Sequence, residues 1–447
     1  MTHPKRPLTV LSLAITGILA FTPAAQAQSL VELYDSARAF DASYLSAKLQ
    51  YDANLARAEQ SRAGILPTAS LTGTATRTDF DTTLAGGSAL IRSYNTQSAT
   101  LSASHPLYRP INRATFEQGQ KQLALARAQL DAAEQELIVR TSQTYFDALA
   151  SQDSLNFVKA QKAAVAEQLA SAKRNFEVGT ATITDTREAQ ARCDLVLAQE
   201  IAAENDLRVK KIALDQLVGK QGTQPRSLVA PPVLQPIEPA DVNAWVQQSE
   251  LAHPSIRLAQ SNLEIARLEV TKAEAGHKPT LDLTGSYNMT RNPSGSASTD
   301  KTSSTNTAAI GLSLNVPLFA GFSTQNRIRE TLSLSDKASS DLEGARRTVA
   351  QSTRTAFFGV VSGQGQVKAL EAAEQSSQIA LEANRLGYQV GVRINIDVLN
   401  SQSQLFQTKR DLAKARYEVL IGGLRLRLAN GSLRAEDLQT INNLLVK

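Results

Sequence analysis

The chain has 447 residues, of which 42% are apolar, 20% charged and 5% aromatic, so its length allows a large core and about three domains. Its 47 Lys and Arg residues exceed its 42 Asp and Glu residues by only five, and the two signs are mixed along the chain, which argues against a nucleic-acid-binding protein. The single cysteine, Cys193, excludes a disulfide framework and any site built from several thiolates.

Residues 1–27 have the features of a signal peptide. Lys5 and Arg6 form a basic start, Leu8–Phe21 is mostly apolar, and Ala25-Gln26-Ala27 is a small-x-small cleavage site. The alternative is a transmembrane anchor, which is disfavoured because the apolar run is shorter than about 18 residues. We therefore expect an exported protein with a cleaved signal peptide. No cysteine stands at the cleavage point, so the sequence does not predict a lipoprotein.

The remaining chain is an internal duplication. The difference between residue numbers 67 and 279, added to any position of the first copy, gives the equivalent position of the second, and we call it the repeat shift. It brings Pro67-Thr68 onto Pro279-Thr280 and Val178-Gly179 onto Val390-Gly391. The same register at both ends of so long a span indicates two copies of one structural unit. Five of the fifteen prolines fall between them and indicate a linker. The predicted division is a first repeat over 28–220, a proline-rich linker over 221–240 and a second repeat over 241–447.

Each repeat is predicted to contain a helix, a β-hairpin and two long helices. Residues 111–224 and 318–447 contain no proline and are rich in helix-forming residues, so helices of about 100 Å are possible at 1.5 Å per residue. Gly179 and Gly391 interrupt these stretches and are predicted to mark the turns of helical hairpins. Three glycines within 359–365 leave open whether the long helix of the second repeat is continuous.

Four short segments with an apolar–polar alternation lie between the helices and predict β-strands of about 10 residues. Such strands are typical of a transmembrane β-barrel, but the alternation is equally compatible with two hairpins on a soluble domain. Four strands cannot close a barrel, since transmembrane barrels start at about eight, and lipid does not tolerate an open sheet edge. If the strands span a membrane, several chains must therefore contribute to one barrel. The segments are residues 69–76, 99–104, 281–287 and 310–316.

Four groups of residues together resemble the TolC family of outer-membrane efflux and secretion channels, over nearly the whole chain after the leader. Each group is weakly specific alone, but their order and spacing are highly specific. The groups are Asn175–Gly179 with Ile183-Thr184-Asp185, Gly276–Leu283, Gly387–Gly391 with Arg393 and Ile396–Leu399, and Ala413–Tyr417.

The resemblance implies a mainly α-helical fold with a β-barrel part. Long α-helical hairpins form a periplasmic α-barrel, and four transmembrane strands per chain contribute to a twelve-stranded barrel in a homotrimer. It also implies the function of an exit duct in the outer membrane of a Gram-negative bacterium, for a tripartite efflux pump or a type I secretion system. The implied partners are a periplasmic adaptor protein, an inner-membrane transporter of the ABC or RND type, and outer-membrane lipid.

The resemblance further implies a gate at the periplasmic tip. Tyr388 and Arg393 are expected to bond to Thr184 and Asp185 as a latch, and Asp397 to form a constriction ring around the threefold axis. The family has a second acidic residue three positions after Asp397, where this chain has Asn400, so a ring of three charges replaces one of six. From the residues alone, the preferred interpretation of Asp185 and Asp397 is that of acids that favour a helix start, and the resemblance reverses this preference. The turns expected to dock the adaptor are Val178-Gly179-Thr180 and Val390-Gly391-Val392.

No residue pattern in the sequence predicts catalysis, a metal site or a cofactor. The four histidines are far apart, and there is no HExxH, GxSxG or P-loop motif. Cys193 is expected to be a buried or inert thiol rather than a nucleophile. The alternative to a conduit is a periplasm-spanning structural or adhesive protein that uses the same helices as a strut. Conductance across a planar bilayer separates the two, because a strut conducts nothing.

Overall fold

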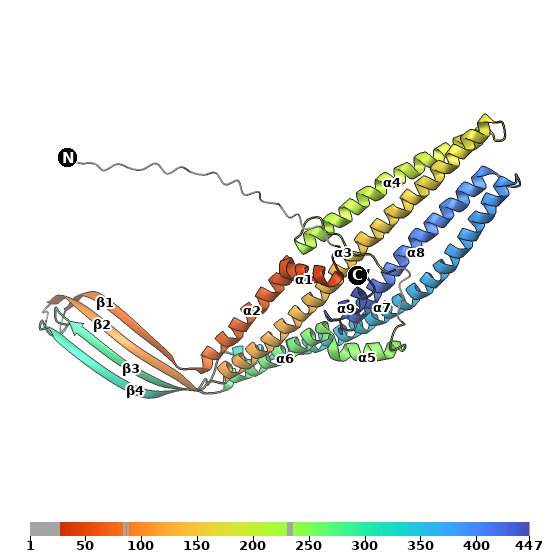
Figure 1. Cartoon of the computed structure of the whole chain (residues 1–447). Helices are drawn as coiled ribbons and strands as arrows, with labels where there is room; N and C mark the ends of the chain where they lie inside the picture. The colour runs from red at the N-terminus through yellow and green to blue at the C-terminus, as the bar shows by residue number, and fades with distance from the viewer. Residues whose placement is uncertain (1–26, 84–85, 87–88, 230–235, 447) are drawn as a thin grey trace, which may run out of the picture.

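The computed structural model describes residues 27–83, 86, 89–229 and 236–446. The predicted signal peptide lies outside the described residues, apart from Ala27. The molecule is elongated, with a four-stranded sheet at one end and the tips of two long helical hairpins at the other (Figure 1).

The first repeat runs from the start of the described chain to the end of its second long helix. Its elements are α1 (Leu30–Phe40), α2 (Ala42–Arg62), the 3₁₀ turn η1 (Ala63–Ile65), β1 (Thr68–Thr83), β2 (Ala89–Tyr108), α3 (Pro110–Glu177) and α4 (Ile183–Val218).

The second repeat has the same order, followed by one short extra helix. Its elements are α5 (Val242–Ala252), α6 (Pro254–Glu274), the 3₁₀ turn η2 (Ala275–His277), β3 (Thr280–Asn292), β4 (Ser303–Asn315), α7 (Ser323–Gln389), α8 (Asn395–Ala429) and α9 (Asp437–Asn442).

The single helix expected before each hairpin is in fact two helices, so this part of the prediction was wrong. Asp41 and His253, which the repeat shift superposes, both have extended backbones that end one helix and begin the next. The Asp41 carboxylate accepts a hydrogen bond from the backbone N–H of Tyr44 at 2.8 Å, and His253 Nδ1 accepts one from Ser255 N–H at 3.1 Å. Both side chains therefore act as N-caps, which stabilise the new helix start.

The long helices are continuous. α3 has 68 residues and α7 has 67, and the glycines at 359, 363 and 365 do not interrupt α7. A Cβ atom on Gly363 would lie 3.0 Å from a methyl group of Val419, so at this position glycine permits α7 and α8 to approach closely. At Gly359 and Gly365 a Cβ would meet nothing within 4 Å, so the chain itself gives no packing reason for these two glycines.

The four strands form one antiparallel sheet in the order β1-β2-β3-β4, and the pairing of β2 with β3 joins the two repeats. The strands have 16, 20, 13 and 13 residues, longer than expected, because backbone pairing continues into polar residues such as Arg77 opposite Asn95. Both outer strands, β1 and β4, have one unpaired edge. Among the described residues, no helix has the length and apolar character needed to cross a membrane.

The beginning of the predicted linker joins both ends of the described chain. Gln28 pairs with Pro225, and Leu228 pairs with Leu445 near the C-terminus. The backbone N–H of Val446 also donates to the carbonyl of Ser227 at 2.9 Å. Leu228 and Leu445 pack in a core cluster that contains residues of α1, α3, α4, α8 and α9. The middle of the molecule is therefore held together by segments far apart in sequence.

The helices lie side by side in a fixed order. α3 packs against α2 and α4 and against α6 and α8, and α7 packs against α5, α6 and α8. From the middle of the molecule to the hairpin tips the order is therefore α4, α3, α8, α7, with α4 and α7 at opposite edges (Figure 1).

The hairpin tips as the candidate functional site

The two hairpin turns have the same backbone structure. Gly179 has φ of +77° and Gly391 has φ of +79°, a left-handed conformation that glycine adopts without steric cost. Thr180 N–H donates to the carbonyl of Asn175 at 2.8 Å, and Val392 N–H donates to that of Gly387 at 2.9 Å, which is the equivalent bond in the second copy. The predicted turns are thus confirmed as turns.

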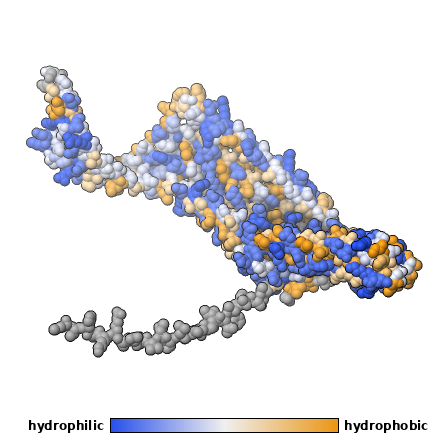
Figure 2. Space-filling view, turned by 90° about the horizontal axis from the view of Figure 1, so that it is seen from above, coloured by the Kyte–Doolittle hydropathy of each residue, from blue (hydrophilic) through white to orange (hydrophobic). Residues whose placement is uncertain are grey.

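The turns form the end of the molecule farthest from the sheet, and they expose apolar side chains there (Figures 1 and 2). A Cβ atom built on either glycine would meet nothing within 4 Å. The two turns are exposed, as a docking site must be, and their role in binding an adaptor stays a prediction. Their exposed apolar residues are Val178, Ile183, Val390, Val392 and Ile394.

Asp185 lies in the first turn of α4 and caps this helix. Its carboxylate accepts hydrogen bonds from the backbone N–H of Thr182 at 2.9 Å and from the Thr182 hydroxyl at 2.7 Å, while that hydroxyl accepts from Asp185 N–H at 3.2 Å. This reciprocal pair is a capping box, which satisfies free N–H groups at the helix start. The interpretation of Asp185 as a helix-start acid is therefore confirmed, whatever else the residue does.

A cavity of about 790 Å³ between the two tips brings together three of the four predicted latch residues, Asp185, Tyr388 and Arg393. The fourth, Thr184, is exposed and does not line the cavity. Among the described residues, neither Tyr388 nor Arg393 bonds to Asp185. The Tyr388 hydroxyl accepts from Asn175 Nδ2 at 3.4 Å, and Arg393 lies 3.7 Å from Asp397.

The predicted constriction residues lie on the first two turns of α8. Asp397 is partly exposed, and its partner Arg393 is more exposed, so this pair contributes little to stability. Asn400 is exposed, and its side-chain oxygen accepts a hydrogen bond from Arg192 of α4 at 2.6 Å. A cation thus stands beside the position where the family pattern has its second acid.

Two buried residues of α8 that sequence analysis did not assign to the site hold the tips together. Asn395 is fully buried; its amide accepts a hydrogen bond from Gln168 and donates one to the backbone carbonyl of Asp185 at 3.2 Å. Leu399 is also fully buried and belongs to an apolar cluster otherwise made by α3 and α4. By the repeat shift, Asn395 corresponds to Ile183 and Leu399 to Arg187. This difference in residue type between the two copies was the signal in the sequence that could have identified the two buried residues.

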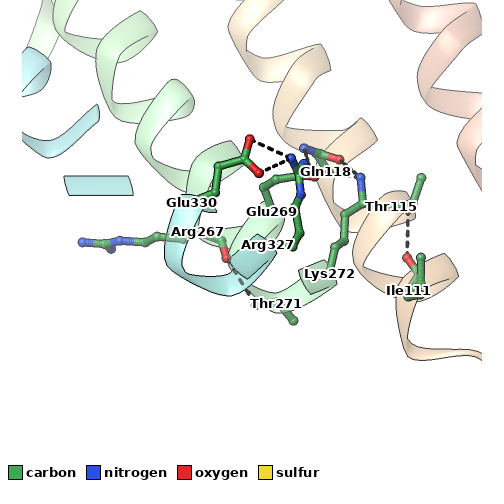
Figure 3. A network of polar contacts seen from close by, with 9 residues as sticks. All are labelled: Ile111, Thr115, Gln118, Arg267, Glu269, Thr271, Lys272, Arg327 and Glu330. Carbon is green, nitrogen blue, oxygen red and sulfur yellow. Dashed lines mark hydrogen bonds and ion pairs between the residues drawn. The ribbon is translucent and has the colours of Figure 1, made fainter. Parts of the chain in front are cut away.

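A polar network fixes the helices at the other end, next to the sheet (Figure 3). Glu269 of α6 accepts hydrogen bonds from Gln118 of α3 at 3.2 Å, from Lys272 at 3.0 Å and from Arg327 of α7 at 2.8 Å. Burial raises the pKa of Glu269, but these three donors outweigh burial, and the pKa lies below its ordinary value. The network joins α3, α6 and α7 next to the strands. The sheet is thereby attached to α3 and α7, the helices that extend to the tips.

Comparisons with known proteins agree with this architecture. A family described as "Outer membrane efflux protein" matches residues 33–220 and 245–432, two ranges that the repeat shift superposes at both ends. Outer membrane protein TolC of Vibrio cholerae is 32% identical over 438 residues, covering 98% of each chain. The alkaline protease secretion protein AprF of Pseudomonas aeruginosa is 31% identical over 373 residues, covering 83% of this chain and 75% of that protein.

Solved structures show the same fold. The structure of the outer membrane protein VceC from Vibrio cholerae has a TM-score of 0.78 at 19% identity, over 90% of this chain and 96% of that chain. The predicted duplication and the predicted mixed fold are confirmed. The chain therefore belongs to the outer membrane efflux protein family and is similar to TolC over nearly its whole length.

Proposed function

We propose that the protein is the exit duct of a tripartite efflux pump or a type I secretion system in the outer membrane of a Gram-negative bacterium. Substrates pass through it passively after an ABC or RND-type inner-membrane transporter has moved them, with a periplasmic adaptor between the two. The proposal includes export by a cleaved signal peptide, no lipid anchor and no catalytic step. It also retains the repeat boundaries 28–220 and 241–447.

The observation that carries this proposal is the four-stranded sheet with two unpaired edges. Lipid does not tolerate unpaired backbone groups, and transmembrane barrels need about eight strands or more. Several sheets of this kind have to close one barrel, and three of them give twelve strands. The number three follows from the family, whereas the need for more than one chain follows from the strands. Helices continuous with such a barrel form a tube that leads to its lumen.

The decisive experiment measures mass and conductance on the same preparation. Protein extracted from outer membranes in detergent is expected to have the mass of a trimer and to form discrete conducting channels in a planar bilayer. A stable folded monomer excludes the shared barrel. A trimer that never conducts, with its tips either intact or truncated, supports the alternative of a periplasm-spanning strut.

A further inference from the structure

A cavity of about 420 Å³ lies between α3, α4 and α8, three helices that pack side by side (Figure 1). It shares no lining residue with the cavity between the tips. Two of the described residues that line it are arginines and none is acidic, so we call it the arginine cavity. Its polar lining includes Gln161 of α3, Arg192 and Gln199 of α4, and Asn400, Gln407 and Arg410 of α8.

Both guanidinium groups of this cavity are held by neutral acceptors. Arg192 donates from Nη2 to Asn400 Oδ1 at 2.6 Å. Arg410 donates from Nη1 to Gln161 Oε1 at 3.2 Å and from Nη2 to Gln407 Oε1 at 2.6 Å. Among the described residues, neither guanidinium has a carboxylate within ion-pair distance, so two positive charges face one cavity without compensation.

A carboxylate partner is available to another arginine of the same helix. Arg416, further along α8, forms an ion pair with Glu371 of α7 at 2.9 Å. At Arg410, by contrast, burial lowers the pKa of the guanidinium by more than the nearby Asp411 carboxylate raises it. A partly buried charge without a counter-charge is unfavourable, and an anion in the cavity removes this penalty.

Gln199 adds a further polar group to the arginine cavity. Its Oε1 atom is buried and has no hydrogen-bond partner among the described residues. Rotation of the amide by 180° exchanges this acceptor for the NH₂ group, which has two donors. The cavity can therefore offer an amide donor in addition to two guanidinium groups, and what it lacks is a negatively charged acceptor.

The basic character of the cavity does not come from the duplication. The repeat shift places Gln404 at the position equivalent to Arg192, and Ala198 at the position equivalent to Arg410. The helices of both copies pack as long hairpins, so this packing does not by itself require an arginine at either position. The two arginines come from different copies and meet only in the tertiary structure.

We propose that the arginine cavity binds a small anion with two or more negative charges, carried by carboxylate or phosphate groups. Asn400 and Gln407, which hold the two guanidiniums, lie two turns apart on one face of α8, about 10 Å. A multivalent anion reaches both guanidiniums from this cavity, whereas a monovalent ion neutralises only one. Arginine binds carboxylate and phosphate through strong charge-assisted hydrogen bonds. The site lies within one chain and is independent of the proposed function.

The first test is calorimetric titration of the full-length protein in detergent, at constant ionic strength set with sodium chloride. Citrate and inorganic pyrophosphate are the multivalent probes, and acetate is the monovalent one. Saturable binding of citrate, pyrophosphate or both, at one site per chain and at least about tenfold tighter than acetate, is expected. Citrate alone identifies a carboxylate ligand and pyrophosphate alone a phosphate ligand. Failure of both to bind above the chloride background overturns the proposal.

Substitution of the arginines locates the binding. Arg192→Gln and Arg410→Gln are each expected to weaken binding of the anion by about tenfold, because each removes a charge-assisted hydrogen bond. Arg416→Gln is the matched control, since it removes the same charge from α8 outside the cavity, and it should bind as the parent does. An equal loss in all three variants means attraction by net charge and contradicts the site.

A variant that supplies the missing acid tests the site without removing either arginine. Gln199→Glu keeps the size of the side chain and places a carboxylate in the cavity. It is expected to raise the unfolding temperature of the ligand-free protein and to abolish the binding of citrate and pyrophosphate. Ala198→Glu adds the same charge at the adjacent exposed position and should leave binding intact. Parent-like binding by Gln199→Glu would overturn the assignment of the anion to this cavity.

Discussion

Tyr417 of α8 donates a hydrogen bond from its phenol to the carboxylate of Asp153 on α3 at 2.6 Å, and this bond joins the second helical hairpin to the first. Burial raises the pKa of both groups; the Asp153 charge raises that of Tyr417 further, and the bond from Tyr417 lowers that of Asp153, but by less than burial raises it. The pair lies where α8 of the second hairpin packs against α3 of the first.

Tyr417→Phe is expected to destabilise the protein by about 2 kcal/mol at neutral pH, because a buried carboxylate loses its donor. Asp153→Asn keeps an acceptor for Tyr417 and removes the charge, so it should cost much less. A folded pKa above the unfolded one means that the Asp153 contribution is most favourable at low pH and is lost as pH rises through the folded pKa. Thermal unfolding from pH 4 to pH 8 should show this decline in the parent and not in Asp153→Asn.

Substitution at the second tip separates backbone strain from docking. Gly391→Val forces a β-branched residue into a left-handed conformation, at a cost of about 1–2 kcal/mol, whereas asparagine tolerates this conformation. Both side chains have room, since a Cβ at this position meets nothing within 4 Å. If the tip docks an adaptor, Gly391→Val and Gly391→Asn should both reduce export while trimers still reach the membrane. Normal export by Gly391→Asn would leave strain as the only role of this glycine.

The double variant Tyr388→Phe with Arg393→Ser is expected to increase single-channel conductance. Both side chains line the cavity between the tips together with Asp185, and the substitutions remove the two donors that the proposed latch requires. Arg385→Ser is the matched control, because Arg385 lines the same cavity and carries the same charge but is not part of the latch. A double variant with the conductance of the parent, or a control that opens equally, rules out a latch.

The constriction should prefer cations, and Asp397→Ala should abolish this preference together with the block by multivalent cations from the periplasmic side. Asn400→Asp should tighten the block, but Arg192 lies against this position and would pair with the new carboxylate. The combination of Asn400→Asp with Arg192→Gln should therefore lower the blocking concentration more, by roughly fivefold, since one unpaired charge contributes about 1 kcal/mol at close range. If Asp397→Ala changes neither selectivity nor block, Asp397 serves only the start of α8.

The sequence by itself determined the duplication, the helical hairpins with turns at Gly179 and Gly391, and the four strands. These features are local or periodic: a positive φ favours glycine, alternation reveals a strand, and one constant shift in numbering reveals a repeat. The breaks at Asp41 and His253 were within reach of the same reasoning, because each residue is an N-cap type or precedes a proline.

Only the tertiary structure decided which residues of the two copies have different partners. Leu399 is buried among α3 and α4, Asn400 receives a hydrogen bond from Arg192, and Phe146 is covered while its counterpart Phe358 is exposed. Phe146 and Phe358 are the same residue at equivalent positions, so the local pattern cannot distinguish them. The distinction arises because α3 has a neighbour on each side within the chain, whereas α7 lies at the edge of the layer.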